Sequence, residues 1–332
     1  MHLVRFGVVG TNFITNAFIQ AGRTVDGFEA AAVCSRTEER AAAFAETHGI
    51  ERRFTSVEEM AASDDVDAIY IASPNAAHAE QAIAALRRGK HVLCEKPIAS
   101  NEREASAMVD AARENGVLLM EALKTTFLPN FQAIREALPR IGPVRRFFGS
   151  YNQYSSRYDA YRAGTVLNAF DPTLSNGALM DLGVYCVYPC VLLFGMPSSV
   201  KANAVMLASG VDGAGSLLLG YDGMEAVIQY SKITSSDLPG EIQGEDGTIV
   251  FDRMSQPTKV ELVHRDGRRE DLTREQSEHT MAYEIAAFVE LARRGATESD
   301  VNRLEVSLRS MRVMDEARRQ FGLVYPADRS GD

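Results

Sequence analysis

The stretch RFGVVGTNFIT, from Arg5 to Thr15, decides how the amino-terminal half of this chain folds. An apolar run of strand length enters a turn at Gly10, and a helical pattern follows the turn. A loop that holds a dinucleotide has glycine at the tight turn, glycine where the backbone meets the pyrophosphate, and a small residue where the helix packs on the strand. Gly10, Asn12 and Thr15 occupy these places. Taken alone, the stretch fits an ordinary strand-to-helix turn as well.

Asn12 stands where such a loop normally has its second glycine. Asparagine is the non-glycine residue that most readily accepts a left-handed backbone, so we expect it to be tolerated there. Its side-chain amide is also a candidate donor to a phosphate oxygen.

The residues that follow alternate between strand-like runs and helical patterns. The apolar runs AAAVCS, VDAIYIAS, HVLCEKP and VLLMEAL are separated by helical segments, and Asn101 with Glu104 forms a capping box for one of them. Alternation of apolar strands with helices implies a parallel sheet that is covered on both faces. We therefore predict a doubly wound α/β domain over residues 1–123.

From Lys124 onward the pattern changes to strand-like segments separated by Gly, Asp and Pro. The triplets YDG, EDG and RDG are turn signals that indicate mostly antiparallel pairing. Two helical patterns end the chain, and their apolar positions are Met281, Ile285, Phe288, Val289 and Ala292 in one and Leu304, Leu308, Met311 and Met314 in the other. We predict an α+β domain over residues 124–332 with a large, open, mostly antiparallel sheet, and the C-terminal helices are candidates to pack back on the first domain.

The composition limits the partners. The chain has 332 residues and a net charge of −10, which disfavours nucleic acid and anionic membranes. The apolar run Leu3–Val9 has no basic leader or cleavage site, and we find no apolar stretch near the ~20 residues of a membrane helix. We expect a soluble, cytoplasmic protein. The four cysteines, Cys34, Cys94, Cys186 and Cys190, lack the partners of a metal site and are expected to be reduced structural thiols.

The second strand ends in CSRTEER, where a cofactor with a free ribose 2′-hydroxyl is usually held by Asp or Glu. This chain has Ser35 and Arg36, with Arg40 one helical turn later. A hydroxyl and a guanidinium suit a 2′-phosphate better, which favours NADP over NAD. Alternatively, Ser35 caps the next helix through Glu38 while Arg36 is merely solvated, and both interpretations can hold together.

The loop SPNAAH, Ser73–His78, follows the strand VDAIYIAS. Pro74 and Asn75 fit ordinary turn chemistry, but ligands of open α/β sheets lie at this end of the strands. We expect His78 to cap the helix that it begins rather than to act in catalysis.

The stretch CEKP, Cys94–Pro97, places a lysine directly after a buried strand and beside Glu95. Burial lowers the pKa of a lysine and makes it a proton donor or an electrostatic partner, so Lys96 is a catalytic candidate. A solvated loop lysine is the alternative.

The stretch NGALMDLGVYCVYP, Asn176–Pro189, carries Asp181 and Tyr185, which share a face of a helix. The glycines on either side of Asp181 allow close approach of backbone or ligand. Tyrosine titrates near pH ~10, so as a general acid or base it needs a nearby cation such as Lys96. A core tyrosine bonded to a carboxylate is the structural alternative.

Together these motifs resemble the glucose–fructose oxidoreductase/inositol dehydrogenase (Gfo/Idh/MocA) family of NAD(P)-dependent oxidoreductases. The matching stretches are GVVGTNFI, CSRTEERAAAFA, SPNAAHAEQAIAALRRGKHVLCEKPIA, Glu121–Ala122 and GALMDLGVY. The resemblance implies a Rossmann domain, then a substrate domain whose open sheet often mediates dimers or tetramers.

The resemblance also implies roles for single residues. Lys96 matches the catalytic lysine, Pro97 is often preceded by a cis bond, and Asp181 matches the aspartate of the second motif. Tyr185 occupies a position that is histidine in the inositol dehydrogenase branch, and tyrosine resembles the xylose and dihydrodiol dehydrogenase branch, which mostly uses NADP. The predicted cofactor-binding residues are Gly10, Thr11, Asn12, Phe13, Ile14, Ser35, Arg36, Arg40, Ser73, Pro74, Asn75, His78, Glu95, Lys96 and Pro97.

After Glu121 the chain departs from the family pattern, since it reads ALKTTFLPNF. Lys124 and Asn168 are the candidate substrate contacts. The expected reaction moves a hydride between nicotinamide C4 and a sugar, polyol or dihydrodiol carbon, with Tyr185 exchanging the hydroxyl proton, Lys96 binding the oxygen and Asp181 orienting the substrate or the lysine. Two alternatives stay open: a glycoside hydrolase that uses NAD transiently, and a non-catalytic nucleotide or sugar sensor.

Overall fold

The structure is a computed structural model that describes residues 3–329 of the chain. In that range the backbone divides into two compact units. The first comprises residues 3–124 together with Ser277–Ser307, and the second comprises Thr125–Gln276 together with residues 308–329. The first unit is therefore assembled from two separate segments of the chain.

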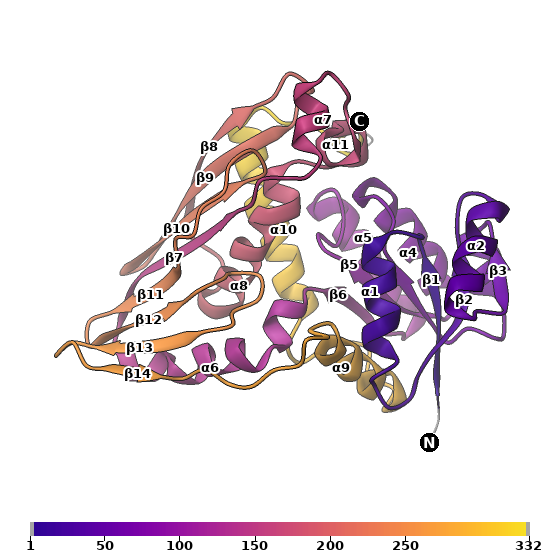
Figure 1. The fold of residues 1–332 in the computed structure, drawn as a ribbon, viewed down its shortest axis with the longest axis horizontal. Helices are drawn as coiled ribbons and strands as arrows, with labels where there is room; N and C mark the ends of the chain where they lie inside the picture. Colours follow the sequence, from indigo (N-terminus) through magenta and orange to yellow (C-terminus); the bar gives the residue numbers. More distant parts are fainter. Residues whose placement is uncertain (1–2, 330–332) are drawn as a thin grey trace. The chain divides into compact units, whose positions relative to one another are not determined.

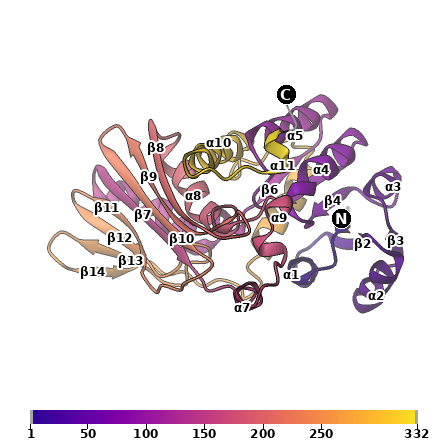
Figure 2. The same ribbon diagram turned by 90° about the horizontal axis from the view of Figure 1, so that it is seen from above.

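The first unit is built on a parallel sheet with the strand order β3-β2-β1-β4-β5-β6. Its strands are β1 (Val4–Val9), β2 (Phe28–Cys34), β3 (Arg52–Phe54), β4 (Ala68–Ile71), β5 (His91–Glu95) and β6 (Leu119–Ala122). Its helices are α1 (Phe13–Gly22), α2 (Glu38–His48), α3 (Val57–Ala62), α4 (His78–Arg87), α5 (Glu102–Asn115) and α9 (Ala282–Arg293), with the short turn η1 (Asn75–Ala77). In Figure 2, α1 and α9 lie on one side of the sheet and α4 and α5 on the other. This doubly wound order is typical of dinucleotide-binding domains and confirms the predicted fold class.

Aromatic rings fill the layer between the sheet and helices α1 and α9. The ring of Phe6 in β1 lies 5.5 Å from that of Phe18 in α1 and 5.5 Å from that of Phe288 in α9. Phe18 also stacks on Tyr70 of β4 at 3.7 Å. All four side chains are fully buried, and burying one such side chain contributes about 2 kcal/mol. Helix α9, which is far away in sequence, therefore completes the core of this unit.

The second unit is built on a large sheet with the order β14-β13-β12-β11-β7-β10-β9-β8. Its strands are β7 (Val144–Asn152), β8 (Ser199–Met206), β9 (Asp212–Tyr221), β10 (Met224–Ser231), β11 (Gly240–Gly244), β12 (Gly247–Phe251), β13 (Val260–His264) and β14 (Arg269–Asp271). Its helical segments are η2 (Lys124–Phe127, which begins at the last residue of the first unit), α6 (Pro129–Ala137), η3 (Leu138–Ile141), α7 (Tyr158–Arg162), η4 (Asn168–Phe170), η5 (Pro172–Leu174), η6 (Leu179–Gly183), α8 (Val184–Phe194), most of α10 (Leu304–Phe321) and α11 (Pro326–Arg329). All neighbouring strands are antiparallel except β7 and β10, which confirms the predicted mostly antiparallel sheet.

Helices α8 and α10 lie over one face of this large sheet (Figures 1 and 2). The burial of β10 follows from this arrangement: Ala226, Ile228 and Tyr230 are buried, whereas Gln229 between them is exposed. Such a period of two is expected for a strand with one covered and one solvated face.

The segment Pro172–Phe194 is long and apolar enough to cross a membrane by length and composition, which differs from our expectation that no stretch reaches that length. However, 72% of its most apolar window is buried inside the protein. The core helix of a globular domain has this property, because its apolar surface faces other protein elements.

Candidate active site

The loop after β1 has the backbone that a dinucleotide loop needs at Gly10. Its φ is +100°, and a Cβ at this position would lie 2.8 Å from the carbonyl oxygen of Ala72 at the end of β4. A side chain is therefore excluded both by backbone conformation and by space. Gly10 thus fits the predicted tight turn of the loop.

Asn12 differs from our expectation. Its backbone is extended, with φ −105° and ψ −179°, so a left-handed conformation is not the reason for asparagine. Its side-chain oxygen accepts hydrogen bonds from the backbone N–H groups of Ile14 (3.0 Å) and Thr15 (3.2 Å) and so caps α1. Its amide donates to the carbonyl oxygen of Ala72 at 2.7 Å rather than pointing to a ligand from this loop. Asn12 therefore holds the loop to the end of β4.

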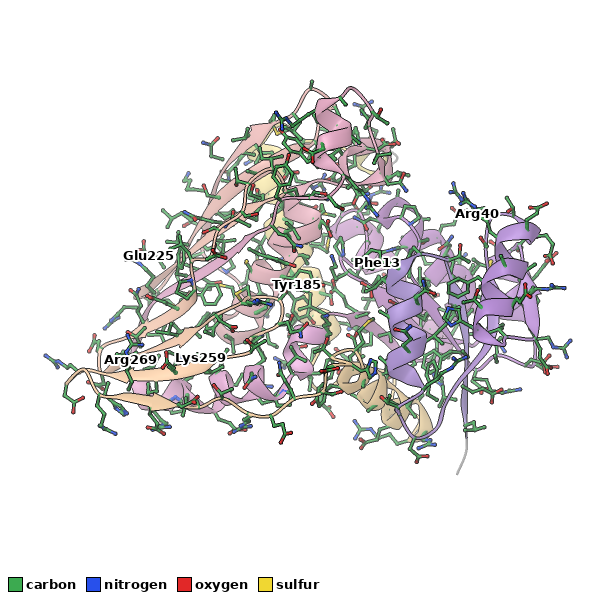
Figure 3. The ribbon with its side chains drawn as sticks, viewed as in Figure 1. Phe13, Arg40, Tyr185, Glu225, Lys259 and Arg269 are labelled. Carbon is green, nitrogen blue, oxygen red and sulfur yellow. The ribbon has the colours of Figure 1, made fainter. Side chains whose placement is uncertain are left out.

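Helix α1 begins at Phe13, whose side chain is 71% exposed (Figure 3). The first turn of the helix has no acidic residue. The partial positive charge of the helix N-terminus is therefore not offset locally, which suits an anionic pyrophosphate.

The loop after β2 brings Ser35, Arg36 and Arg40 to the neighbouring strand end. Thr37, not Ser35, caps α2, since its hydroxyl accepts from the backbone N–H of Arg40 at 3.4 Å, and the predicted cap at Ser35 is wrong. Ser35 is buried, while Arg36 and Arg40 are exposed (Arg40 in Figure 3). Two guanidinium groups are thus available at the strand end where the 2′-position of a bound dinucleotide is recognised.

His78 has a structural role between two loops. Its ring nitrogens lie 3.0 Å from the carbonyl oxygen of Pro97 and 3.0 Å from that of Ser73, and it is buried. The helix α4 that it begins has no side-chain cap, so the predicted capping role is wrong. Burial lowers the pKa of His78, although the two carbonyl groups favour its protonated form. His78 therefore ties the loop after β4 to the loop after β5.

The loop after β5 carries Lys96, and the bond between Lys96 and Pro97 is cis, as the resemblance implied. Glu95 is buried and accepts hydrogen bonds from the hydroxyl of Tyr70 at 2.6 Å and from the backbone N–H of Lys96 at 3.3 Å. Burial raises the pKa of Glu95, and the charge of Lys96 opposes that rise. The carboxylate of Glu95 thus holds the backbone of the loop at Lys96.

Two further buried carboxyl groups lie in this unit, and the sequence patterns did not single them out as site residues. Glu121 accepts from the backbone N–H of Ile98 at 3.0 Å, and burial raises its pKa to about 7. Burial also raises the pKa of Glu284 in α9 well above its usual value, with Glu95 adding to the effect and Lys124 opposing it. Lys124, a predicted substrate contact, donates to the Thr280 hydroxyl at 3.1 Å.

Asp181 and Tyr185 belong to the second unit. Asp181 lies in the π-helical turn η6, a distortion that is often found at functional sites, and Tyr185 follows in the first turn of α8. Tyr185 is half-buried, and its ring packs edge-on against Tyr151 of β7 at 5.6 Å (Tyr185 in Figure 3). The Asp181 carboxylate forms an ion pair of 2.8 Å with Lys232, a partner that the sequence patterns did not indicate.

The glycines around Asp181 serve the packing of the protein itself. A Cβ at Gly177 would lie 2.1 Å from a carboxylate oxygen of Asp212, and one at Gly183 would lie 3.1 Å from the ring of Tyr230. Asn168, the other predicted substrate contact, is exposed, and its carbonyl oxygen accepts from the side chain of Asn176 at 2.8 Å.

The strand order, the four loops at the carboxyl ends of β1, β2, β4 and β5, and the motif around Asp181 define an NAD(P)-dependent oxidoreductase. Residues 4–123 match the oxidoreductase family with an NAD-binding Rossmann fold, and residues 131–250 match the GFO/IDH/MocA C-terminal domain. The chain belongs to the Gfo/Idh/MocA family, as its motifs suggested.

Known relatives extend this match over the whole chain. It is 55% identical to scyllo-inositol 2-dehydrogenase (NADP(+)) IolU of Bacillus subtilis, over 99% of this chain and 100% of that protein. It is 33% identical to trans-1,2-dihydrobenzene-1,2-diol dehydrogenase of Xenopus laevis, over 97% of this chain and 99% of the relative. A 3-ketoreductase from Actinomadura kijaniata, crystallised with NADP and TDP-benzene, has a TM-score of 0.83 and 27% identity over 96% of this chain and 98% of its own.

Proposed function

We propose that this enzyme is an NADP-dependent dehydrogenase of cyclic polyols, with scyllo-inositol as the first candidate substrate. The observation that carries the proposal is the full-length 55% identity to a scyllo-inositol 2-dehydrogenase that is named for NADP(+). The dihydrodiol dehydrogenases among the relatives support a substrate with hydroxyl groups on adjacent ring carbons.

The cofactor preference is proposed to rest on Arg36 and Arg40. Both are exposed at the end of β2 and carry guanidinium groups, which pair well with a phosphate. Replacing Arg36 by Ser should lower kcat/KM for NADP about 10- to 100-fold, the usual range for a charge-assisted contact, and leave the value for NAD nearly unchanged. Arg87→Ser, at an exposed position on the last turn of α4, is the matched control. Equal losses with NAD and NADP would contradict this assignment.

We assign Lys96, Tyr185 and Asp181 to the chemistry. A bound nicotinamide would supply the hydride acceptor for the carbinol carbon. Tyr185 would act as the general base that takes the hydroxyl proton. Lys96 would donate a hydrogen bond to the reacting oxygen and offset the negative charge that develops there, and Asp181 would orient the substrate. In the reverse direction Tyr185 returns the proton to the oxygen.

The test is oxidation of scyllo-inositol with NADP⁺, followed at ~340 nm, for Lys96→Met and Tyr185→Phe. We expect each change to lower kcat at least ~100-fold, as is typical when a general acid–base group is lost, while NADPH binding persists. If both variants kept the normal kcat/KM, the assignment would be wrong. Tightly bound cofactor without net turnover of any polyol would instead favour the transient-oxidation glycosidase or the sensor.

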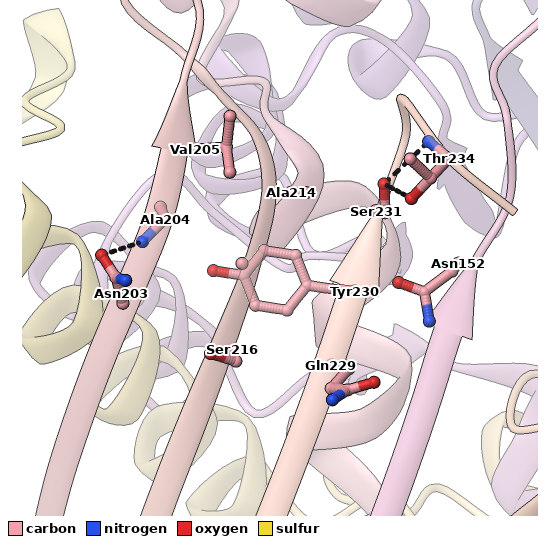
Figure 4. A pocket seen from close by; sticks show the side chains of 11 residues that line it. Asn152, Asn203, Ala204, Val205, Ala214, Ser216, Gln229, Tyr230, Ser231 and Thr234 are labelled. Atoms are coloured by element: carbon pink, nitrogen blue, oxygen red, sulfur yellow. Dashed lines mark hydrogen bonds between the residues drawn. The ribbon is translucent and has the colours of Figure 1, made fainter. Parts of the chain in front are cut away.

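We also propose that the protein is a cytoplasmic homo-oligomer that pairs through the outer face of its large sheet. On this face Leu218 and Val205 are 45% and 57% exposed. Beside them lies an open groove of about 260 Å³, whose polar lining includes Asn152, Ser216 and Gln229 (Figure 4). Leu218→Glu should lower the mass measured by light scattering to that of one chain. Leu238→Glu, at a loop position that is 55% exposed, should not. An unchanged mass for Leu218→Glu would exclude this face.

A further inference from the structure

Lys232 is a buried lysine directly after β10 in the second unit. Its side chain is 2% exposed, and its ammonium group lies 2.8 Å from Oδ2 of Asp181 and 3.1 Å from the carbonyl oxygen of Ala169. The same group lies 5.3 Å from the centroid of the Phe170 ring. Removing a lysine ammonium from water in this way costs free energy unless an opposite charge and hydrogen bonds replace the water. Asp181 supplies the charge.

The ion pair is asymmetric. The Asp181 side chain is 37% exposed, whereas that of Lys232 is almost completely enclosed. The Asp181 side chain is therefore partly accessible, whereas the cation that pairs with it is enclosed by the protein. A surface pair in which both partners are mobile would hold neither group in place, whereas a buried lysine fixes the position of its partner.

A second carboxylate fixes the backbone that carries Asp181. Asp212 of β9 is fully buried and accepts hydrogen bonds from the N–H groups of Ala178 (3.1 Å) and Leu179 (2.7 Å), where the π-helical turn η6 begins. Gly177 gives Asp212 the space for this contact. Burial raises the pKa of Asp212 to about 6, and the charge of Lys232 is one of the effects that oppose the rise.

We infer that Lys232 is a positioning residue of the active site, which holds the Asp181 carboxylate ionised and in one orientation while Asp212 anchors the turn beneath it. The inference rests on the proposed role of Asp181 in orienting the substrate. The ammonium pairs with the Asp181 carboxylate and lies near the Ala169 carbonyl oxygen and the Phe170 ring. Its charge also acts on the Asp212 carboxylate, which in turn acts on the Tyr230 hydroxyl. Loss of Lys232 would remove the cation that pairs with the Asp181 carboxylate at 2.8 Å.

A double-mutant cycle tests this inference on the full-length enzyme, with scyllo-inositol and NADP⁺ as the probe reaction. Lys232→Met should lower kcat/KM about 10- to 100-fold in the normal background and less than about 3-fold when Asp181 is already Asn, because interacting residues are not additive. Lys232→Arg, which keeps the cation, should recover most of the activity. Lys259→Met removes an exposed lysine of an ion pair in the same unit and should change nothing.

A second measurement separates positioning from a merely structural role. Lys232→Gln keeps a hydrogen-bond donor but removes the charge, so the acid limb of the kcat/KM profile should move to higher pH as the positive charge beside Asp181 is lost. Equal losses from Lys232→Met in both Asp181 backgrounds, or an unmoved acid limb with Lys232→Gln, would overturn the inference alone. If Asp181→Asn by itself left kcat/KM unchanged, both this inference and the proposed role of Asp181 would fail.

Discussion

Asn12 allows a matched test of what this residue does in the dinucleotide loop. Valine and threonine have nearly the same shape, and both readily adopt the extended backbone that Asn12 has. Only threonine has an oxygen that can accept the N–H groups of Ile14 and Thr15. The pair Asn12→Val and Asn12→Thr therefore isolates the helix cap.

The magnitude follows from the contacts. Both variants lose the 2.7 Å hydrogen bond to the Ala72 carbonyl, which contributes about 1 kcal/mol. Valine also loses the cap, which contributes about 1 kcal/mol more. We expect Asn12→Thr to reduce the free energy of unfolding by about 1 kcal/mol and Asn12→Val by about 2 kcal/mol. Asn12→Gly should stay close to Asn12→Thr, because glycine at this position costs only a few tenths of a kcal/mol.

Two measurements check this. Urea unfolding of the cofactor-free protein gives the stability difference, and amide hydrogen exchange at Ile14 and Thr15 reports on the cap directly. The fluorescence of NADPH, excited directly, measures cofactor binding in each variant. We expect NADPH binding to weaken most for Asn12→Val and to persist for Asn12→Gly. Equal stability and equal amide protection in the valine and threonine variants would refute the capping explanation.

Three further predictions concern the first unit. Gly10→Ala should abolish NADPH binding, because the alanine Cβ would lie 2.8 Å from the Ala72 carbonyl oxygen on a backbone with φ +100°. Unchanged NADPH affinity in a fluorescence titration would contradict this. His78→Phe should raise the NADPH Kd about 10-fold, roughly the effect of losing the better of its two carbonyl contacts, and calorimetric titration would detect it. Burial raises the pKa of Glu121 from 4.5 to about 7 in the folded protein. Between these two pH values the unfolded chain loses the Glu121 proton while the folded protein keeps it. The free energy of unfolding should therefore fall by about 3 kcal/mol as the pH rises from 4.5 to 7. Glu121→Gln should remove this fall, and thermal unfolding of both proteins at pH ~5 and ~8 measures it. The same pH dependence in the Glu121→Gln variant as in the original protein would contradict the prediction.

The sequence predicted those parts of the fold that depend on local patterns. Alternation of strands and helices indicated the doubly wound sheet, and the turn triplets correspond to real hairpins, since Tyr221 of YDG pairs with Met224 in the register of β9 and β10. The parallel pairing of β7 with β10 joins strands that are distant in the chain. Hydrophobic periodicity carries no information about which distant strands become neighbours.

Site residues that stand in a sequence motif were predicted, whereas site residues that only tertiary packing brings together were missed. Lys96 in CEKP and Asp181 in GALMDLGVY stand in recognisable patterns, whereas Lys232 follows β10 in the unremarkable stretch YSKI. An ion pair between residues 51 positions apart leaves no periodic signal in the sequence. Asn12 shows a different limit: its conformational preference suggested a left-handed turn, but the hydrogen bonds of its side chain decide its backbone.

The two-segment construction of the first unit has a consequence for how the chain is made. A ribosome delivers β1 first, yet the ring of Phe288 that packs on Phe6 arrives only after all strands of the large sheet have been synthesised. During that interval α1 covers only part of this aromatic layer, and the part that α9 covers later stays exposed, which makes the nascent unit prone to aggregation. Expression of residues 1–124 alone would make this intermediate permanent. Binding studies on the isolated nucleotide-binding unit should therefore fuse residues 277–307 to that fragment.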